Sequence, residues 1–332
     1  MKCFVTGADG FIGSHLCEAL RDAGHEVTGL ALYNSFDTFG WLDEVDGVRK
    51  VRGDVRDAEQ MRKFVTGQDV VFHLAALISV PYSFEYTESQ FVQTNVQGTT
   101  NVLAAARDAG VRLFVQTSSS EVYGTRASSY GMNERHVLNP QSPYAVSKLS
   151  ADLMALAFHK AHRLPVVVLR PFNTYGPRQS ERALIPATIR QVIDPRCEFV
   201  RVGSLETKRD YTFVSDTCSA FLSIMDSSFG TPRIGGPFPL IGEVVNCGSE
   251  KSHSGAFILD TIMALTGITK PVAKELERVR PLHAEVMDLE ADASSIAIAA
   301  NWRAKTTMLD GLERTIEWWR TRTPRKDLAY VA

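Results

Sequence analysis

The 332-residue sequence lacks a charge imbalance, a long apolar run and a recognisable cysteine pattern. Lys and Arg number 36 against 38 Asp and Glu, a formal net charge of −2, so the charge does not indicate a nucleic acid or an anionic membrane as partner. No segment approaches the roughly 20 apolar residues of a membrane span. The first apolar strand is expected almost at Met1, which leaves no room for a signal peptide. We therefore expect a cytoplasmic protein.

The five cysteines are scattered and include no CxxC pair. This spacing is typical of buried thiols in a reducing compartment and argues against a disulfide framework. His, Cys and acidic residues show no metal-ligand spacing either, so no metal is expected. The five positions are Cys3, Cys17, Cys197, Cys218 and Cys247.

The N-terminal segment has the pattern of a dinucleotide-binding βαβ unit. Residues 2–6 form a short apolar run, an amphipathic helix is expected from about Ser14 to Asp22, and a second strand over 26–32. Gly7, Gly10 and Gly13 lie between the first strand and the helix, where glycines permit a tight turn and let the backbone approach a pyrophosphate.

The alternation of strands and helices continues through the first half of the chain. A near-continuous apolar strand is expected over 70–77, an amphipathic helix ends at Gly110, and PVVVLRPFN forms a later strand. The pattern predicts an α/β fold with a doubly wound parallel Rossmann sheet over residues 1–176. A smaller, mixed α/β C-terminal substrate domain is expected over 177–332, with some segments returning to the first domain.

Candidate catalytic residues lie in TSSSEVYG, at 117–124, and in SPYAVSK, at 142–148. Tyr144 and Lys148 are four residues apart, so on a helix they share one face. A cationic Lys beside a phenol favours the phenolate, which can act as a general base. A Ser at a nearby strand end can hydrogen-bond the same reacting hydroxyl of the substrate. Glu121 adds a carboxylate for which a plain alcohol dehydrogenase has no use.

Taken together, these segments resemble the extended short-chain dehydrogenases/reductases of the nucleotide-sugar branch, nearly from end to end. The resemblance rests on TGADGFIG, GDVRD (53–57), HLAA (73–76), TNVQGTTNVL, SSSEVYG, YAVSK, RPFNTYGPR (170–178) and KRDYTFVSD (208–216). ALYNSFDTFGWLD and RPFNTYGPRQSERALIP are similar to NAD-dependent 4,6-dehydratases acting on UDP-N-acetylglucosamine in nonulosonic (legionaminic-type) sugar pathways. The implied partner is a nucleotide-diphosphate sugar.

The resemblance assigns roles to individual residues. Asp54 would bond the adenine amino group, and Lys148 the nicotinamide ribose. Arg209 and Arg280 would clamp the diphosphate, because guanidinium forks suit phosphate oxygens. The implied cofactor-binding set is Gly7, Gly10, Phe11, Ile12, Gly13, Asp54, Val55, Leu74, Ala75, Ala76, Tyr144 and Lys148. The implied substrate-binding set is Ser79, Asn173, Arg209, Asn246 and Arg280.

The implied catalytic set is Ser119, Ser120, Glu121, Tyr144 and Lys148. Ser119 and Tyr144 would oxidise the sugar at carbon 4, and Glu121 would remove the proton from carbon 5. Water then leaves from carbon 6 and the stored hydride returns there, so the cofactor stays bound. Many deoxysugar dehydratases have an Asp, as acid, where this chain has Ser120. GDP-mannose dehydratases also have a Ser there, which implies that Glu121 acts both as the base for carbon 5 and as the acid for the leaving hydroxyl.

Three alternatives remain open at this point. UDP-glucuronate decarboxylases share the hydroxyl-Ser-Glu pattern and need a cation for the substrate carboxylate, for which Arg178 and Arg182 are candidates. Sugar 4-epimerases usually have a Thr or similar group at the position of Glu121. Non-catalytic cofactor-sensing proteins of this fold typically lose the Tyr, the Lys or the glycine pattern, all of which are present here.

The resemblance favours tightly bound NAD and leaves NADP open. NAD-preferring members usually end the second strand with an acid that bonds the ribose, but the position near Ala31 has neither an acid nor an Arg for a 2′-phosphate. Asn34, Ser35 and Asp37 are the candidates for this contact. Helices expected over about 99–108 and 145–162 have Ala-rich faces, and in this family such helices form a four-helix interface, so a homodimer is expected.

Overall fold

The computed structural model describes residues 1–85, 87–127, 129–229, 240–275 and 285–322. Its main element is a seven-stranded sheet in the order β10-β6-β5-β4-β1-β2-β3, in which every neighbouring pair is parallel. The strands are β1 (Lys2–Thr6), β2 (Glu26–Leu32), β3 (Arg49–Gly53), β4 (Val70–His73), β5 (Leu113–Thr117), β6 (Val166–Pro171) and β10 (Val244–Cys247).

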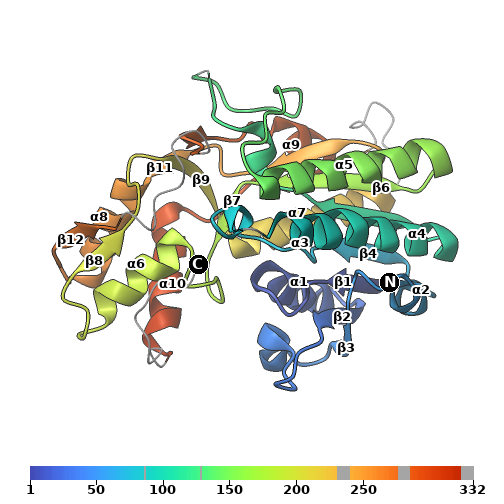
Figure 1. The fold of residues 1–332 in the computed structure, drawn as a ribbon, viewed down its shortest axis with the longest axis horizontal. Helices are drawn as coiled ribbons and strands as arrows, with labels where there is room; N and C mark the ends of the chain where they lie inside the picture. Colours follow the sequence, from blue (N-terminus) through green and yellow to red (C-terminus); the bar gives the residue numbers. More distant parts are fainter. Residues whose placement is uncertain (86, 128, 230–239, 276–284, 323–332) are drawn as a thin grey trace.

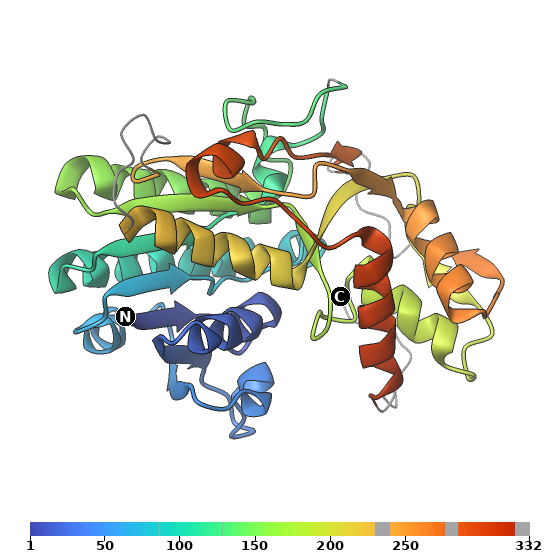
Figure 2. The ribbon, with the colours of Figure 1, turned by 180° about the vertical axis from the view of Figure 1, so that it is seen from behind.

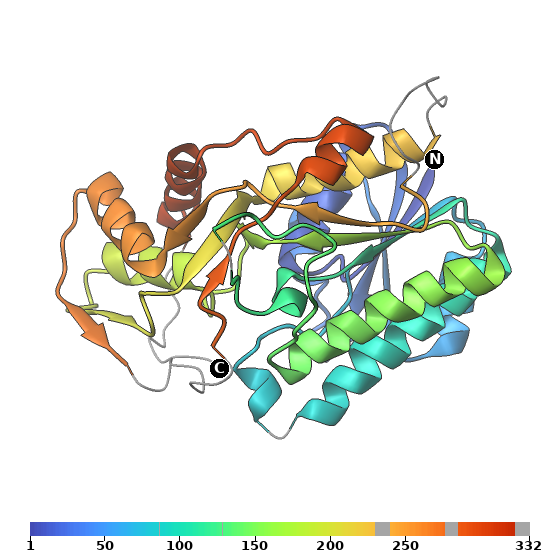
Figure 3. The same ribbon diagram turned by 90° about the horizontal axis from the view of Figure 1, so that it is seen from above.

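Helices cover both faces of this sheet (Figures 1 and 2). One face is covered by α2 (Ala58–Val65), α4 (Thr99–Ala109) and α5 (Pro143–His162), and the other by α1 (Phe11–Asp22) and α7 (Val214–Phe229). The two layers are separate in the view from above (Figure 3). Neighbouring side chains of each strand enter opposite cores, because a strand alternates its faces. Phe4 packs under α4, whereas Val5 packs under α1 and α7. The expected doubly wound parallel α/β fold is confirmed.

The C-terminal region lies beside the carboxyl edge of the sheet (Figure 1). It has a small sheet of β7 (Asn173–Tyr175), β9 (Lys208–Phe213), β11 (Ser252–Ser254) and β13 (Asp288–Leu289), and a pair, β8 (Val200–Val202) with β12 (Val272–Lys274). Its helices are α6 (Leu184–Ile193), α8 (Gly255–Thr266), α9 (Ser294–Ala300) and α10 (Met308–Arg320). β10 is a strand of the main sheet and α7 packs against that sheet, so residues after 177 contribute to both regions.

Several element ends differ from the sequence prediction. The strand expected over 70–77 ends at His73, so Leu74 and the residues after it leave the sheet edge. The helix expected to end at Gly110 starts after a short helix, α3 (Glu88–Phe91), as a π-helix, η3 (Val92–Gly98), and continues as α4. Gly110 ends it with φ of +64°, a conformation that favours glycine. No helix among the described residues is long and apolar enough to cross a membrane.

Candidate active site

A cleft of about 1010 Å³ lies where the main sheet meets the C-terminal region. Its walls come from the segments that follow β1, β4, β5 and β6, which end at one edge of the sheet, and from α6 and β9. Ligands of doubly wound folds bind at this edge. The cleft brings together most of the predicted site residues: Gly7, Gly10, Phe11, Ile12, Gly13, Leu74, Ala75, Ala76, Ser79, Ser119, Glu121, Tyr144, Lys148, Asn173 and Arg209.

The glycine turn after β1 forms a cradle that larger residues would fill. Gly7 has φ of +65°, and a Cβ there would lie 2.8 Å from the backbone nitrogen of Ala75. A Cβ at Gly13 would collide with the carbonyl oxygen of Gly7. Gly10 is the N-cap of α1, and no side chain caps this helix end in the described part of the chain. The exposed backbone N–H groups and the helix dipole therefore suit a pyrophosphate.

The loops after β1 and β4 are held together by Thr6. Its hydroxyl oxygen accepts hydrogen bonds from the backbone N–H groups of Leu74, at 3.1 Å, and Ala75, at 3.0 Å. The same oxygen lies 2.8 Å from Nδ1 of His73, whose Nε2 lies 3.0 Å from the Thr99 hydroxyl. Burial, with the charge of Lys148, lowers the pKa of His73 to about 3, so this histidine is neutral.

Asn95 positions a wall of the cleft, a role that the sequence analysis missed. Its carboxamide oxygen accepts from the N–H of Leu77 at 2.8 Å, and its amide donates to the carbonyl of Leu77 at 3.0 Å. The same amide donates to the hydroxyl of Ser147 on α5, at 2.9 Å. Asn95 thus ties the loop after β4 to the helix that carries Tyr144. The only signal in the sequence was its place in TNVQGTTNVL.

The residues predicted for the adenine end lie outside the cleft lining. The Asp54 carboxylate accepts hydrogen bonds from Arg56, and this guanidinium lowers the pKa of Asp54. Val55 is buried against Gly98. The structure therefore shows Asp54 bound to a neighbouring cation, a pairing that the motif GDVRD did not indicate.

The loop after β2 has polar contacts of its own. Asn34 accepts from the N–H of Phe36 at 3.1 Å and donates to the Thr38 carbonyl at 2.9 Å, which makes it a turn-stabilising residue. Asp37 pairs with Arg52 at 2.7 Å. The acid nearest the end of β2 is Asp9, whose carboxylate accepts from the N–H of Leu32 at 3.2 Å.

The catalytic pair lies at the start of α5. Ser142 caps the helix by accepting from the N–H of Ala145 at 3.1 Å, and Pro143 occupies its first turn. Tyr144 and Lys148 consequently face the cleft one helical turn apart. The Lys148 ammonium donates to the carbonyl oxygen of Thr117 at 2.6 Å, which joins the helix to the end of β5.

The electrostatics of this pair differ from the sequence expectation. Burial lowers the pKa of Lys148 to about 8, against the Asp152 carboxylate, which raises it. Burial, and then the charges of Glu121 and Asp152, raise the pKa of Tyr144 to about 12, while a hydrogen bond with Ser119 acts in the opposite direction. In the protein alone, burial and the two carboxylates therefore outweigh the hydrogen bond with Ser119 and favour the neutral phenol of Tyr144.

The triplet Ser119–Glu121 follows β5 directly. Ser119 has an extended backbone and caps the short 3₁₀-helix η4 (Ser120–Tyr123), accepting from the N–H of Glu121 at 3.2 Å. Ser119 and Glu121 line the cleft, and the charge of Glu121 acts on the Tyr144 phenol. Ser120, although predicted as catalytic, is only 2% exposed and is not among the residues that line the cleft.

Three of the predicted substrate residues, Ser79, Asn173 and Arg209, line the cleft from different segments of the chain. Arg209 is buried on β9, donates to the Lys208 carbonyl at 2.9 Å and pairs with Glu285 at 3.4 Å. Asn173 begins β7, and Ser79 has φ of +90° in the loop after β4. Arg280 lies outside the described residues. Among the described residues, no group of three or more His, Cys, Asp or Glu side chains could hold a metal ion.

Asn246 corrects one prediction. It is fully buried on β10, where its amide donates to the carbonyls of Met132, at 2.8 Å, and Asp292, at 3.3 Å. Its carboxamide oxygen accepts from the Tyr123 hydroxyl at 2.8 Å. The side chain is therefore occupied within the core, and it does not line the cleft. Burial of this kind cannot be inferred from a lone Asn in a strand.

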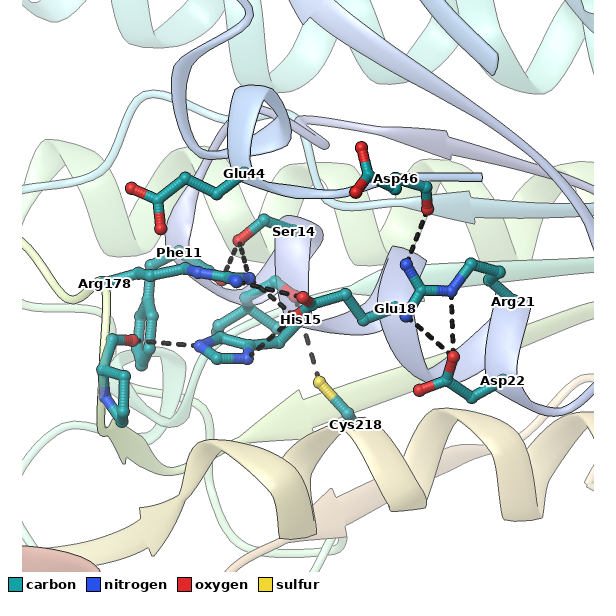
Figure 4. A network of polar contacts seen from close by, with 12 residues as sticks. Phe11, Ser14, His15, Glu18, Arg21, Asp22, Glu44, Asp46, Arg178 and Cys218 are labelled. Carbon is teal, nitrogen blue, oxygen red and sulfur yellow. Dashed lines mark hydrogen bonds and ion pairs between the residues drawn. The ribbon is translucent and has the colours of Figure 1, made fainter. Parts of the chain in front are cut away.

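Arg178 reaches from the start of the C-terminal region to the cofactor helix (Figure 4). Its guanidinium binds both carboxylate oxygens of Glu18, at 2.7 and 3.0 Å, and lies 3.4 Å from the Ser14 hydroxyl. Beside it, His15 donates from Nε2 to the carbonyl of Pro177 at 3.0 Å. These contacts fix the first turns of α1 against the chain that follows β7. Arg182, the other candidate cation, is exposed and lines the cleft.

The comparisons with known proteins agree with this geometry. Residues 3–248 match the NAD dependent epimerase/dehydratase family. The chain belongs to this family. A dTDP-glucose 4,6-dehydratase of Streptomyces niveus is 31% identical over 329 residues, which cover 96% of this chain and 93% of that protein.

Other members catalyse different reactions. A UDP-N-acetyl-alpha-D-glucosaminuronate decarboxylase of Bacillus cytotoxicus is 29% identical over 96% of this chain and 98% of its own length. The UDP-glucuronic acid 4-epimerase of Bacillus cereus, solved with UDP-glucuronic acid and NAD, has a TM-score of 0.85 at 27% identity and covers 96% of this chain and 99% of its own. Membership in the epimerase/dehydratase family therefore establishes an enzyme class and leaves the reaction to the site.

Proposed function

We propose that this epimerase/dehydratase family member is an NAD-dependent nucleotide-sugar 4,6-dehydratase. The observation that carries the proposal is Glu121, a carboxylate 8% exposed in the same cleft as Tyr144 and close enough to raise the pKa of that phenol. A dehydratase needs a base for carbon 5 beside the group that oxidises carbon 4. The relative from Streptomyces niveus, named as a 4,6-dehydratase, supports the same assignment.

The chain's own residues suffice for the proton transfers. Tyr144, bonded to Ser119, takes the proton of the 4-hydroxyl; Lys148, by its charge, supports the phenolate that this requires. Glu121 removes the proton from carbon 5 and delivers it to the 6-hydroxyl, which leaves as water. A solvent-derived proton returns to carbon 5, and Tyr144 releases the proton of the 4-hydroxyl to solvent. When bound, NAD would supply the hydride acceptor for carbon 4 and the hydride donor for carbon 6, and its positively charged oxidised ring would favour the phenolate of Tyr144.

NAD fits the glycine cradle at α1 and the wall from Leu74 to Ala76. Because the hydride is returned in each cycle, we expect the cofactor to be retained through purification. For the substrate, we propose that Arg209, which lines the cleft from β9, binds the diphosphate. The sequence similarity favours UDP-N-acetylglucosamine as the sugar nucleotide. We further propose a homodimer that pairs α4 and α5 of the two subunits.

Of the two candidate cations for a decarboxylase, Arg178 and Arg182, the first is engaged within the chain, which favours dehydration as far as Arg178 is concerned. A decarboxylase needs a cation for the substrate carboxylate, and Arg178 already binds a carboxylate of its own chain, that of Glu18. A bidentate pair of this kind leaves little of the guanidinium for a second carboxylate.

The test is to mix the purified protein, with no added cofactor, separately with UDP-N-acetylglucosamine, dTDP-glucose and UDP-glucuronate, and to follow each by mass spectrometry. Loss of one water from a sugar nucleotide is expected. Loss of carbon dioxide from UDP-glucuronate would show a decarboxylase, and isomerisation without a change of mass would show an epimerase. Either result would overturn the proposal, and a repeat with added NAD covers a cofactor lost in purification.

A further inference from the structure

Two residues that flank the catalytic triplet are held by the same buried ion pair. On one side, the Ser118 hydroxyl donates to Oδ2 of Asp152 at 2.6 Å. On the other, the Tyr123 hydroxyl accepts from the Arg170 guanidinium at 3.0 Å. Asp152 and Arg170 are joined at 3.1 Å, with side chains 0% and 3% exposed. The two ends of the loop from Ser118 to Tyr123 are therefore held by the same ion pair.

The pair is anchored in rigid elements. Asp152 lies on α5, one turn beyond Lys148, and Arg170 lies near the end of β6. The guanidinium uses different nitrogens for its two partners: Nε donates to Asp152, and one terminal nitrogen donates to Tyr123. A Lys at this position has one compact ammonium group and cannot reproduce this fork. The helix that carries Tyr144 and Lys148 thus also fixes the loop that carries Glu121.

Further contacts hold each end of the loop. At the first end, the N–H of Ser118 donates to the carbonyl of Leu169 at 2.8 Å. At the second end, the Tyr123 hydroxyl donates to Asn246 at 2.8 Å, and its ring packs on Phe172 with centroids 6.3 Å apart. Between these ends, the backbone contacts of Ser119–Val122 with the described residues include local turn bonds and a hydrogen bond from the Asn139 N–H to the Val122 carbonyl at 3.0 Å.

We propose that Asp152, Arg170 and Tyr123 are positioning residues that set Ser119 and Glu121 at the correct distances from the sugar. This rests on the proposed dehydratase function. The two ends of the loop then affect different steps. Ser118 is adjacent to Ser119 and affects oxidation at carbon 4, whereas Tyr123 is closer to Glu121 and affects proton removal from carbon 5. Displacements of about 1 Å in such a site can lower a rate about a hundredfold.

The test uses two variants that each remove one oxygen atom, and a third, Arg170→Lys, that removes the guanidinium fork. Tyr123→Phe is expected to lower kcat for water loss about tenfold or more, and the reduced cofactor should accumulate during turnover, because elimination becomes slow. Ser118→Ala is expected to lower kcat without this accumulation, because oxidation becomes slow. Arg170→Lys should resemble Tyr123→Phe.

Tyr175→Phe is the matched control. Tyr175 is also a fully buried tyrosine, and its hydroxyl donates to the Met308 carbonyl at 3.3 Å, away from the loop. If Tyr123→Phe and Ser118→Ala have the kcat and the cofactor absorbance of Tyr175→Phe while the wild type releases water, the positioning role is overturned.

Amide hydrogen exchange separates this result from a failure of the proposed function. Exchange at Glu121 and Val122 should become faster in Tyr123→Phe and stay unchanged in Tyr175→Phe, whatever reaction the enzyme catalyses. Unchanged exchange in both variants would contradict the positioning role of Tyr123 even if the wild type proves to be a dehydratase.

Discussion

Arg178 donates hydrogen bonds to both carboxylate oxygens of Glu18, although the two residues are 160 positions apart. Glu18 lies on α1, whose N-terminus forms the phosphate cradle, and Arg178 follows β7, which carries Asn173. The pair therefore couples the cofactor helix to the segment that forms the substrate wall. It also engages Arg178, one of the two cations, with Arg182, that a decarboxylase could use.

Replacing Glu18 with Gln should destabilise the protein by about 1–2 kcal/mol, because Arg178 loses a charged acceptor in a mostly buried site. Less NAD should remain bound after purification, since α1 is no longer fixed. Thermal unfolding and chromatographic quantitation of released cofactor check both effects. Glu317→Gln is the control, because Glu317 pairs with Arg320 at an exposed site. Equal stability and equal cofactor content in the two variants would refute this role.

The pKa of Lys148, about 8, predicts an alkaline limit to activity. Above this pH the amine is neutral and no longer supports the Tyr144 phenolate, so kcat should fall about tenfold per pH unit. Arg at this position stays protonated. Lys148→Arg should therefore have a lower kcat overall but no decline over the same range. A flat wild-type profile across this range would show that the charge of Lys148 is not required.

His73 should make the fold sensitive to acid. Its pKa is about 3 in the folded protein and near 6.5 in an unfolded chain, so only the unfolded state takes up a proton between these values. The free energy of unfolding should therefore fall as the pH falls below about 6.5, by up to about 1.4 kcal/mol per pH unit.

Urea unfolding of the wild type and of His73→Asn at about pH 7 and about pH 5 measures this contribution. The free energy of unfolding of the wild type, relative to that of the variant, should be about 2 kcal/mol lower at the acidic pH. His162→Asn, at an exposed position, is the control. A difference that does not change with pH would mean that folding does not shift the pKa of His73.

The proposed dimer predicts which exposed apolar residues are covered. Val146 and Leu153 lie seven residues apart on α5, at 49% and 56% exposure, and Val92 on η3, which contacts α5, is 56% exposed. The double variant Val146→Glu, Leu153→Glu should be a monomer by size-exclusion chromatography with light scattering. Phe257→Glu on α8 should leave the dimer intact. A dimer that survives the double substitution would place the interface elsewhere.

Local patterns were enough to predict the sheet and the positions along the cleft. β1 and β2 have the bounds that their apolar runs predicted, and Tyr144 and Lys148 face the cleft one turn apart on a helix, as their spacing predicted. What the sequence could not supply were pairings between distant charges. Asp152 with Arg170 and Glu18 with Arg178 join separate elements, and no local spacing specifies such contacts.

The same limit explains the corrected predictions. Asn246 was a candidate for the substrate pocket, yet β10 places it in the core, where it binds Tyr123. The phenol of Tyr144 was expected to ionise readily beside Lys148, yet burial raises its pKa to about 12. Burial depends on the whole fold, so neither outcome could be derived from residue type and spacing.

The most direct test of the account is the reaction of Glu121→Gln with the sugar nucleotide from which the wild type removes water, run in deuterium oxide. We predict that the wild-type product lacks one water and carries deuterium at carbon 5. The variant should form reduced cofactor and 4-keto sugar slowly, with no water loss and no deuterium at carbon 5. Water loss by Glu121→Gln at the wild-type rate would contradict the assignment of Glu121 as the base.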